Sequence, residues 1–269
     1  MKNSDRLYRI KPKETVRLVD FPAEATGHFT REDEALDELQ RHRKRLDQLQ
    51  ELFAIDGRHA LLIVLQGMDT GGKDGTIRHI FSGVNPQGCD VTSFKVPSSL
   101  EARHDFLWRA HNAVPPRGMI GIFNRSHYED VLVVRVHGQI TGKQAHQRMR
   151  DIVHWEEMLA DNNVIILKFF LHISYDEQTR RLQSRLQDPA KRWKLSAADI
   201  AERKLWPKYQ EAYEDVLSRT SRKTAPWFIV PANHKWYRNA VISRVLVETL
   251  EDLKLRHPKP AVDPATIKL

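Results

Sequence analysis

Short apolar runs recur along this chain and alternate with longer stretches in which apolar residues return every third or fourth position. The short runs predict buried β-strands at residues 61–66, 91–96, 119–123, 164–171 and 227–230. The longer stretches predict amphipathic helices at 30–55, 144–161, 196–222 (interrupted near Pro207) and around 241–250. Because strands alternate with helices, we predict an α/β protein with a parallel central sheet that helices cover on both faces.

Two pairs of residues resemble capping boxes and predict where helices begin. Thr30 with Asp33 precedes the helix that ends near residue 55. Ser98 with Glu101 is expected to open a helix that runs through Ala110 and stops before Pro115.

The length of 269 residues fits one large domain with appendages. We expect residues 1–30 to form an extended arm that lies on the domain, because they are mixed in charge and carry Pro12, Pro22 and Gly27. Residues 31–257 form the predicted domain, which includes a lid at about 175–200. Residues 258–269 are a proline-containing tail, expected to be loosely held.

A glycine-rich turn follows the first predicted strand directly and opens a helix expected to reach about residue 84. Its sequence, Gly67-Met68-Asp69-Thr70-Gly71-Gly72-Lys73-Asp74, has the G-x-x-x-x-G-K spacing of a phosphate-binding loop, with Asp74 where Ser or Thr is usual. Backbone N–H groups, the helix N-terminus and the lysine would hold an anion here. The carboxylates of Asp69 and Asp74 indicate metal ligands or a base near the phosphates. The alternative is a glycine-rich turn with no ligand.

A polar cluster, Asn124-Arg125-Ser126-His127-Tyr128-Glu129-Asp130, follows the strand at 119–123. Ligands of open parallel sheets bind beyond the carboxyl ends of the strands, so this cluster is predicted to lie beside the phosphate loop. Arg125 would stabilise charge on a transferring phosphoryl group, and Glu129 and Asp130 would hold magnesium directly or through water. The alternatives are a capped loop with local ion pairs, or a covalent phosphoryl carrier at His127.

A second concentration of charge lies in the predicted lid. Arg180, Arg181, Arg185, Lys191, Arg192 and Lys194 fall within one short span that only Asp188 opposes. So basic a segment is expected to be an exposed flap that closes over a phosphate-rich substrate. The alternative is a solvated basic face.

Composition narrows the choice of partner and compartment. Net charge is +8 with a pI near 9.6, which indicates an anionic partner. No apolar run approaches the roughly 20 residues of a membrane helix, and the first residues lack the apolar segment of a signal peptide. Cys89 is the only cysteine, which favours the reducing cytoplasm. We therefore expect a cytoplasmic protein with no membrane partner.

From about Phe29 to about Leu255 the chain resembles the polyphosphate kinase 2 family. The matching segments are residues 67–75, 85–88, 94–97, 123–130, 191–194 and 231–236. The resemblance implies a three-layer P-loop kinase fold of the thymidylate-kinase type with a basic helical lid. The stretch at 123–136 is most similar to class III of the family, whose members phosphorylate nucleoside mono- and diphosphates.

The resemblance also implies an activity and its partners. The activity is reversible phosphoryl transfer between inorganic polyphosphate and AMP or ADP, forming ADP or ATP. The expected metal ion is Mg²⁺, with Mn²⁺ as an alternative. Guanine nucleotides are an alternative to adenine nucleotides, and we expect a homo-oligomer. The other functions considered are an ATP-dependent kinase of a small metabolite and a nucleic-acid-binding protein. We expect no nucleic-acid partner, because Trp193 is the only aromatic residue among the lid cations.

The resemblance finally assigns the site. Asp69, Lys73, Arg125 and Glu129 are the expected catalytic residues, and the phosphate- and nucleotide-binding residues are Gly67, Thr70, Gly71, Gly72, Lys73, Asp74, Asn124 and Arg125. Polyphosphate is expected to contact Arg181, Arg185, Arg192 and Lys194. Asn124 stands where a Walker B aspartate is usual. The metal ligand must then come from Asp69, Glu129 or Asp130, and we assign it to Asp69 and Asp130.

Overall fold

The centre of the molecule is a parallel sheet. The computed structural model describes residues 8–194 and 197–257. Within them, five parallel strands lie in the order β2 (Cys89–Ser93), β3 (Ile120–Asn124), β1 (Ala60–Gln66), β4 (Val164–His172) and β5 (Trp227–Pro231). Each predicted strand is present, and β2 begins two residues earlier than expected. The predicted parallel α/β sheet is confirmed.

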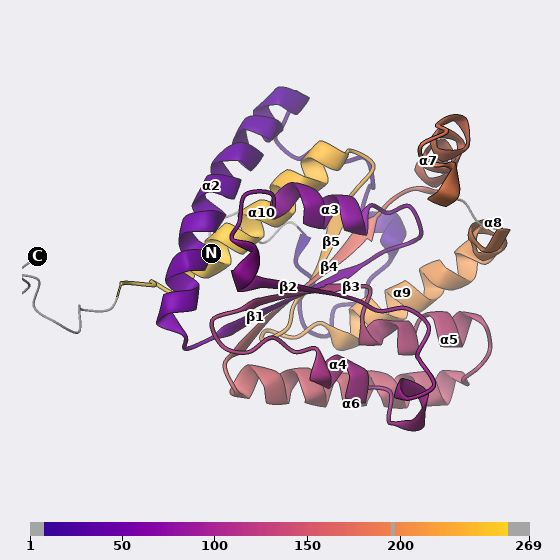
Figure 1. Ribbon diagram of the computed structural model, residues 1–269. Helices are drawn as coiled ribbons and strands as arrows, with labels where there is room; N and C mark the ends of the chain where they lie inside the picture. Colours follow the sequence, from indigo (N-terminus) through magenta and orange to yellow (C-terminus); the bar gives the residue numbers. More distant parts are fainter. Residues whose placement is uncertain (1–7, 195–196, 258–269) are drawn as a thin grey trace, which may run out of the picture.

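Helices form a layer on each face of this sheet (Figure 1). One layer contains α2 (Glu32–Asp56), α3 (Lys73–Ile80) and α10 (Lys235–Asp252), and the other contains α4 (Trp108–Asn112), α5 (Val133–Val136), α6 (Gly142–Asp161) and α9 (Trp206–Thr220). The helices α7 (Tyr175–Gln187) and α8 (Ala197–Arg203), in the region predicted to be a lid, stand beyond the carboxyl ends of the strands. Short 3₁₀ turns are η1 (Leu18–Asp20), η2 (Pro86–Gly88), η3 (Glu101–Arg103), η4 (His127–Asp130) and η5 (Arg192–Lys194).

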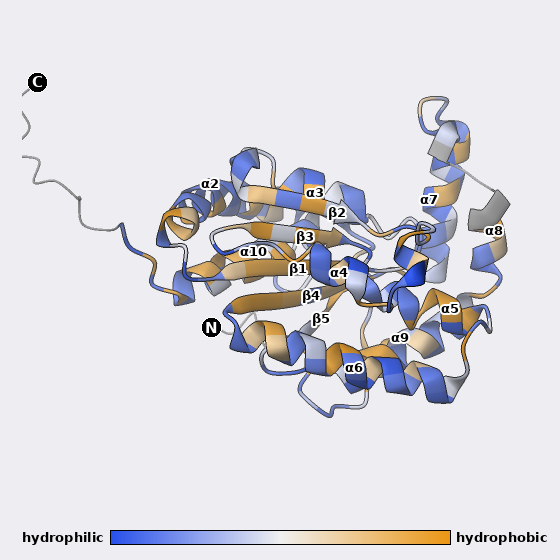
Figure 2. Ribbon diagram, turned by 60° about the horizontal axis from the view of Figure 1, so that its bottom comes forward, coloured by the Kyte–Doolittle hydropathy of each residue, from blue (hydrophilic) through white to orange (hydrophobic). Residues whose placement is uncertain are grey.

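The core lies between the sheet and these two layers. Every residue of β1 is buried, and so is nearly all of β4, which explains their continuous apolar sequences. Figure 2 shows the same division, with apolar residues concentrated on the strands and polar residues on the outer faces of the helices. No helix among residues 8–194 and 197–257 is both long and apolar enough to span a bilayer.

The N-terminal arm covers the β5 edge of the sheet, as far as it is described. The Ile10 amide donates to the Trp227 carbonyl at 2.9 Å, and Arg9 forms a bridge with Phe228. Ile10, Val16 and Leu18 are buried in the core. These residues therefore pack against the rest of the chain, and the division into an arm and a domain stays a prediction. Residues 1–7 and the tail at 258–269 lie outside the described part.

The prediction of one helix from Ser98 through Ala110 is wrong. Ser98 and Glu101 do exchange backbone-to-side-chain hydrogen bonds, at 2.6 and 3.3 Å. The chain nevertheless leaves helical geometry at His104, with φ −105° and ψ 174°, after only the η3 turn. The Asp105 carboxylate then accepts a hydrogen bond from the Leu107 backbone amide at 2.9 Å. A separate helix, α4, begins after this turn.

Other helix ends differ less from prediction. The α2 helix begins at Glu32 with no side-chain cap, because Asp33 pairs with Arg31 and the Thr30 amide donates to Glu34 instead. α3 ends at Ile80, four residues before the expected end. The interruption near Pro207 is confirmed: α8 and α9 are separate, and the proline occupies the first turn of α9, where its missing N–H removes no helical bond.

A charged network lies inside the core. The Lys168 ammonium on β4 contacts the Glu156 carboxylate of α6 at 2.5 Å and donates to the Tyr128 hydroxyl at 2.9 Å. Tyr128 also donates to Glu156 at 2.9 Å, and Lys168 and Glu156 are fully buried. Burial lowers the pKa of Lys168 to about 8, against the opposing effect of Glu156. The network ties η4, which follows β3, to the core.

This network gives the first prediction. Glu156→Leu leaves the Lys168 charge buried without its partner, so we expect a loss of about 3–5 kcal/mol in the free energy of unfolding. Glu156→Leu with Lys168→Met should be less destabilised than Glu156→Leu alone, since no charge remains. Urea unfolding of both variants and of Lys168→Met alone tests this, with exposed Asp33→Leu as a control that should change little. A double variant as unstable as the sum of its singles contradicts the coupling.

Candidate active site

The predicted phosphate loop connects β1 to α3 in the expected manner. Two of its glycines have positive φ, +156° at Gly67 and +99° at Gly72, a region that L side chains rarely adopt. Thr70 is also left-handed, with φ 65°. The chain thus turns sharply at the carboxyl end of β1, where ligands of parallel sheets bind.

Lys73 is the first residue of α3 and is 8% exposed. Its ammonium donates to the Gly67 carbonyl at 2.7 Å and lies 3.4 Å from the Met68 carbonyl. The Lys73 side chain therefore folds back over the loop. Burial and the nearby charge of Arg125 lower the pKa of Lys73 to about 8, although three neighbouring carboxylates act in the opposite direction. The ammonium is held where a bound phosphate would stabilise its charged form.

Arg125 joins the two segments that the sequence predicted to meet. Its guanidinium contacts the Asp69 carboxylate at 2.6 Å and the Glu129 carboxylate at 3.2 Å. Its amide donates to the Leu65 carbonyl at 3.0 Å, and its φ of 61° is left-handed. Burial alone would lower the pKa of Arg125, but Glu129 and Asp69 outweigh burial and raise it. The four expected catalytic residues, Lys73 included, therefore lie together.

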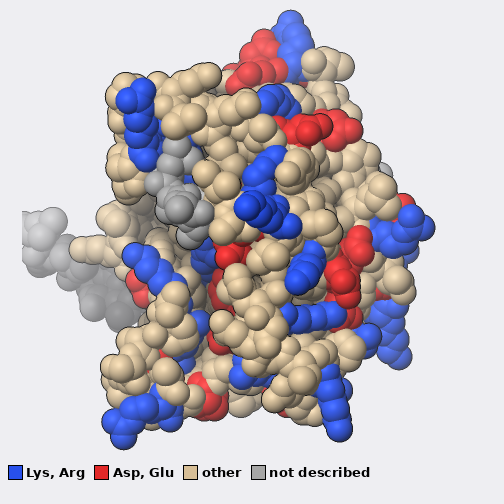
Figure 3. Space-filling view, turned by 90° about the vertical axis from the view of Figure 1, so that its right-hand side faces the viewer, with Lys and Arg blue, Asp and Glu red and all other residues tan. Residues whose placement is uncertain are grey.

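A cavity of 950 Å³ opens in front of the loop. Asn124 and Asp74 face each other on its wall, and the side-chain amide of Asn124 donates to the Asp74 carboxylate at 2.6 Å. The loop, the β3 end, the lid and α10 all contribute to its lining, which includes Asp69, Thr70, Gly72, Lys73, Arg125, Arg180, Arg181, Arg185, Lys191, Lys235 and Arg238. Figure 3 shows this face of the molecule, on which Lys and Arg side chains are spread with Asp and Glu between them. A cavity with this excess of cations suits a polyanion.

Asp130 and His127 lie away from this cavity. The Asp130 carboxylate is nearly buried and paired with Arg109 at 3.0 Å, and it is not part of the cavity lining. His127 is fully buried, 3.4 Å from the Glu156 carboxylate, and burial lowers its pKa despite that neighbour. A covalent phosphoryl carrier at His127 is therefore not supported.

The helix α7 differs from the exposed flap that we predicted, because its residue Arg181 is buried against the rest of the protein. The Arg181 guanidinium pairs with Glu177 at 2.6 Å and donates to the Thr70 and Gly71 carbonyls at 2.9 and 3.2 Å. It also donates to the Ala232 carbonyl at 2.5 Å. The first turns of α7 are therefore fastened to the phosphate loop and to the end of β5.

The other predicted polyphosphate ligands have different positions. Arg185 lines the cavity, and no hydrogen bond or ion pair joins it to another residue of the described part. Arg192 donates to the Leu186 carbonyl at 2.9 Å and is not part of the lining. The side chain of Lys194 lies outside the described residues.

The cavity also includes residues that the sequence reasoning did not assign to the site. Lys235 and Arg238 reach it from α10. Gln178 of α7 is not part of the lining, but it donates to the Asp69 carbonyl at 3.0 Å and so contacts the loop. Lys235 lies within residues 231–236, one of the segments that carry the resemblance. The sequence pattern gave no signal for Arg238, because its neighbours along the chain are uncharged.

Comparison with known proteins places this geometry in a family. The model of the family described as polyphosphate kinase 2 matches residues 30–258. The chain belongs to the polyphosphate kinase 2 family. An AMP/ADP-polyphosphate phosphotransferase of Meiothermus ruber is 51% identical over 254 residues, which cover 94% of this chain and 95% of that protein. An ADP-polyphosphate phosphotransferase of Rhodopseudomonas palustris is 44% identical, over 96% and 94% of the two chains.

Solved structures agree with this assignment. The crystal structure of polyphosphate kinase 2 from Arthrobacter aurescens TC1 matches 98% of this chain and 94% of its own, with 39% identity and a TM-score of 0.95. This polyphosphate kinase 2 chain therefore has the fold of its family. The finer expectation of a thymidylate-kinase type stays a prediction.

A metal ion suits this polyphosphate kinase 2 site only together with a phosphate ligand. Among the described residues, no group of three or more His, Cys, Asp or Glu side chains could hold a metal alone. Asp69 and Asp74 present carboxylates to the cavity. Mg²⁺ typically binds through one or two carboxylates plus substrate phosphates and water, so this sparse donor set fits it.

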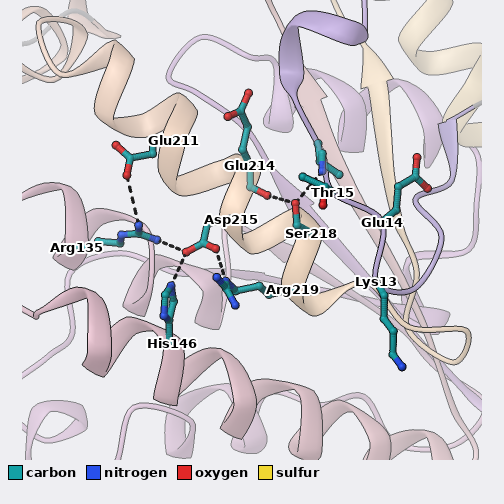
Figure 4. A pocket seen from close by; sticks show the side chains of 11 residues that line it. Lys13, Glu14, Thr15, Arg135, His146, Glu211, Glu214, Asp215, Ser218 and Arg219 are labelled. Carbon is teal, nitrogen blue, oxygen red and sulfur yellow. Dashed lines mark hydrogen bonds and ion pairs between the residues drawn. The ribbon is translucent and has the colours of Figure 1, made fainter.

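A separate cavity of 580 Å³ lies between the N-terminal arm, α6 and α9 (Figure 4). Its charged groups pair with one another: Asp215 accepts from Arg135 at 2.6 Å, from His146 at 2.9 Å and from Arg219. Burial alone would raise the pKa of Asp215, but these hydrogen bonds outweigh burial and lower it. These groups hold α5, α6 and α9 together.

The lowered pKa of Lys73 gives the second prediction. With its pKa near 8, Lys73 is mostly charged at pH 7 and mostly neutral at pH 8.5, so affinity for an inorganic phosphate ligand should fall as pH rises. Between about pH 7 and about pH 8.5, the dissociation constant of tripolyphosphate should rise about fourfold. Calorimetric titration across this range measures it. Lys73→Gln should bind more weakly with no such rise, and a wild type whose affinity is constant over the range refutes the assignment.

Proposed function

We propose that this protein transfers a phosphoryl group between inorganic polyphosphate and AMP or ADP, forming ADP or ATP reversibly. The observation that carries the proposal is the cavity itself, in which Lys73, Asp69 and Arg125 face a lid wall of Arg and Lys. Membership of the polyphosphate kinase 2 family and two relatives of nearly equal length, named for transfer between polyphosphate and AMP or ADP, support it.

The loop and Lys73 hold the terminal phosphoryl group of polyphosphate. A terminal oxygen of the nucleotide attacks its phosphorus, the bridging P–O bond breaks, and the polymer leaves one unit shorter. Such transfers depend on positioning and charge neutralisation more than on covalent chemistry. Arg125 supplies a fixed positive charge next to the loop, because Asp69 and Glu129 set its orientation. Asp69 orients the attacking oxygen.

We assign the metal to Asp69, with Asp74 as its neighbour on the cavity wall. Both line the cavity, whereas Asp130 is engaged by Arg109 and supports the chain after β3. Asp69 and Asp74 would hold Mg²⁺ there together with phosphate oxygens and water, and the ion would supply neutralisation of phosphate charge.

Polyphosphate carries about one negative charge per unit, and we place it along the lid wall. Arg185 is the lid cation best placed to bind it, because it faces the cavity without a partner among the described residues. Arg180 and Lys191 line the same wall, each paired with a carboxylate. A polyanion exchanges its counterions for these cations, as nucleic acids do, so binding should weaken steeply with salt.

We extend the proposal to AMP, because the relative from Meiothermus ruber is named for AMP and ADP and the one from Rhodopseudomonas palustris for ADP. A cytoplasmic homo-oligomer remains our expectation. An ATP-dependent kinase of a small metabolite would share the loop and Lys73, but it would not need a wall of lid cations. It predicts ATP use with a non-phosphate acceptor and no use of polyphosphate.

The third prediction tests the chemistry. Incubation of the protein with ADP, polyphosphate and Mg²⁺ should give ATP, measured with a coupled luminescence assay. Asp69→Asn and Lys73→Ala should each lower the rate by about 10²-fold or more, as loss of one preorganised charge does elsewhere. Asp33→Asn, on the exposed start of α2, is the matched control and should be fully active. Full activity of Asp69→Asn or Lys73→Ala would remove the assigned roles.

The fourth prediction tests the lid. Arg185→Ala should weaken polyphosphate binding more than ADP binding. It should also reduce the slope of log affinity against log salt by about 1, because one cation fewer releases counterions. Fluorescence-polarisation titrations at several salt concentrations measure both, with exposed Arg45→Ala on α2 as the control. Equal losses for the two ligands would count against polyphosphate on the lid wall.

A further inference from the structure

Arg238 lies in the first turns of α10 and is 1% exposed. Its guanidinium donates to the Gly71 carbonyl at 3.3 Å and to the Asn239 side-chain oxygen at 3.1 and 2.8 Å. These acceptors are neutral. Arg238 nevertheless belongs to the lining of the basic cavity, so one part of this buried cation borders the place where phosphate is proposed to bind.

No carboxylate among the described residues forms an ion pair with Arg238. The other buried arginines each have one, because Arg181 pairs with Glu177 and Arg109 with Asp130; half-buried Arg125 pairs with two. The charged neighbour that most affects Arg238 is Arg181, which repels it, and burial together with this repulsion lowers the pKa of Arg238 to about 9. Arg238 is still protonated at neutral pH, so the free protein holds a buried charge with no opposite charge beside it.

The guanidinium also fits closely against the loop. A Cβ at Gly72 would lie 2.0 Å from the nearer terminal nitrogen of Arg238, and one at Gly75 would lie 3.8 Å from the other. Gly72 therefore lacks a side chain for two reasons, its left-handed φ and the guanidinium against it. The positive charge of Arg238 is thus fixed against the turn that precedes Lys73.

We propose that Arg238 is a phosphate-positioning residue of the loop, and that the phosphate bound there supplies its missing negative charge. The inference rests on the proposed function, since it requires phosphate in the loop. Arg238 acts through the backbone of Gly71 and Gly72 and through its electrostatic field. The buried charge destabilises the free protein, and ligand binding removes this penalty.

Thermal unfolding with and without tripolyphosphate tests the proposal. Arg238→Met fills a similar volume without the charge, so its ligand-free melting temperature should equal or exceed that of the wild type. Its tripolyphosphate dissociation constant should rise about tenfold, the loss of one charge-assisted interaction. The increase in melting temperature that tripolyphosphate produces should shrink accordingly. In the assay with ADP, the KM for polyphosphate should rise more than kcat falls.

Arg244→Met is the matched control on the same helix. Arg244 pairs with Glu38 and is not part of the cavity lining, so this variant should lose stability and keep the full effect of tripolyphosphate. Arg238→Gln is a second neutral variant and should behave as Arg238→Met does. Arg238→Lys keeps the charge and should restore part of the ligand effect.

The outcomes separate this inference from the function on which it rests. If tripolyphosphate stabilises the wild type and both neutral variants equally, Arg238 has no part in phosphate binding and the inference fails while the function stands. If both neutral variants are unfolded or strongly destabilised, Arg238 is a requirement of the fold and the inference also fails. A wild type that tripolyphosphate does not stabilise, and that forms no ATP, refutes the proposed function.

Discussion

Four cations converge on one glycine turn, and much of the structure counteracts their mutual repulsion. Lys73, Arg125, Arg181 and Arg238 all line the cavity before this turn. Arg125 is balanced by two carboxylates and Arg181 by Glu177 and backbone carbonyls. Lys73 lies against carbonyls and has a lowered pKa, and Arg238 has neutral acceptors only. The positive field that remains is what a polyphosphate ligand would find.

The parallel sheet makes this convergence possible. Because β1 lies between β3 and β4, the carboxyl ends of three strands meet at one edge, with Leu65 opposite both Asn124 and Phe169. Arg125 comes one residue after β3, and its amide donates to the Leu65 carbonyl, so the strand register itself fixes where its guanidinium begins. The buried pair of Lys168 and Glu156 holds the following turn through Tyr128. A shift of register would separate Arg125 from Asp69.

Sequence patterns predicted the sheet, the loop and the meeting of Asp69 with Arg125, because these follow from periodicity and strand ends. Three features were beyond them. The chain leaves helical geometry at His104 and the Asp105 side chain caps the next turn, neither of which a capping pair at 98 and 101 reveals. The charge pattern predicts one exposed basic surface for the lid segment. In the structure Arg181 is buried there and donates to loop carbonyls. Asp130 was grouped with Glu129 by adjacency, but in a 3₁₀ turn the two point to different arginines, Arg109 and Arg125.

The buried position of Arg181 changes what the lid does. A freely swinging flap would bring polymer and loop together only on closure, and each substrate would have to be positioned anew. Here Arg181 and Gln178 donate to the loop backbone directly, so the first turns of α7 are fastened to the turn that the proposed function assigns to phosphate. Arg185, one helical turn further along, then stands at a fixed offset from Lys73. A polymer bound at Arg185 would place its terminal unit near the loop with little further ordering, so its affinity would contribute directly to positioning the reacting phosphate.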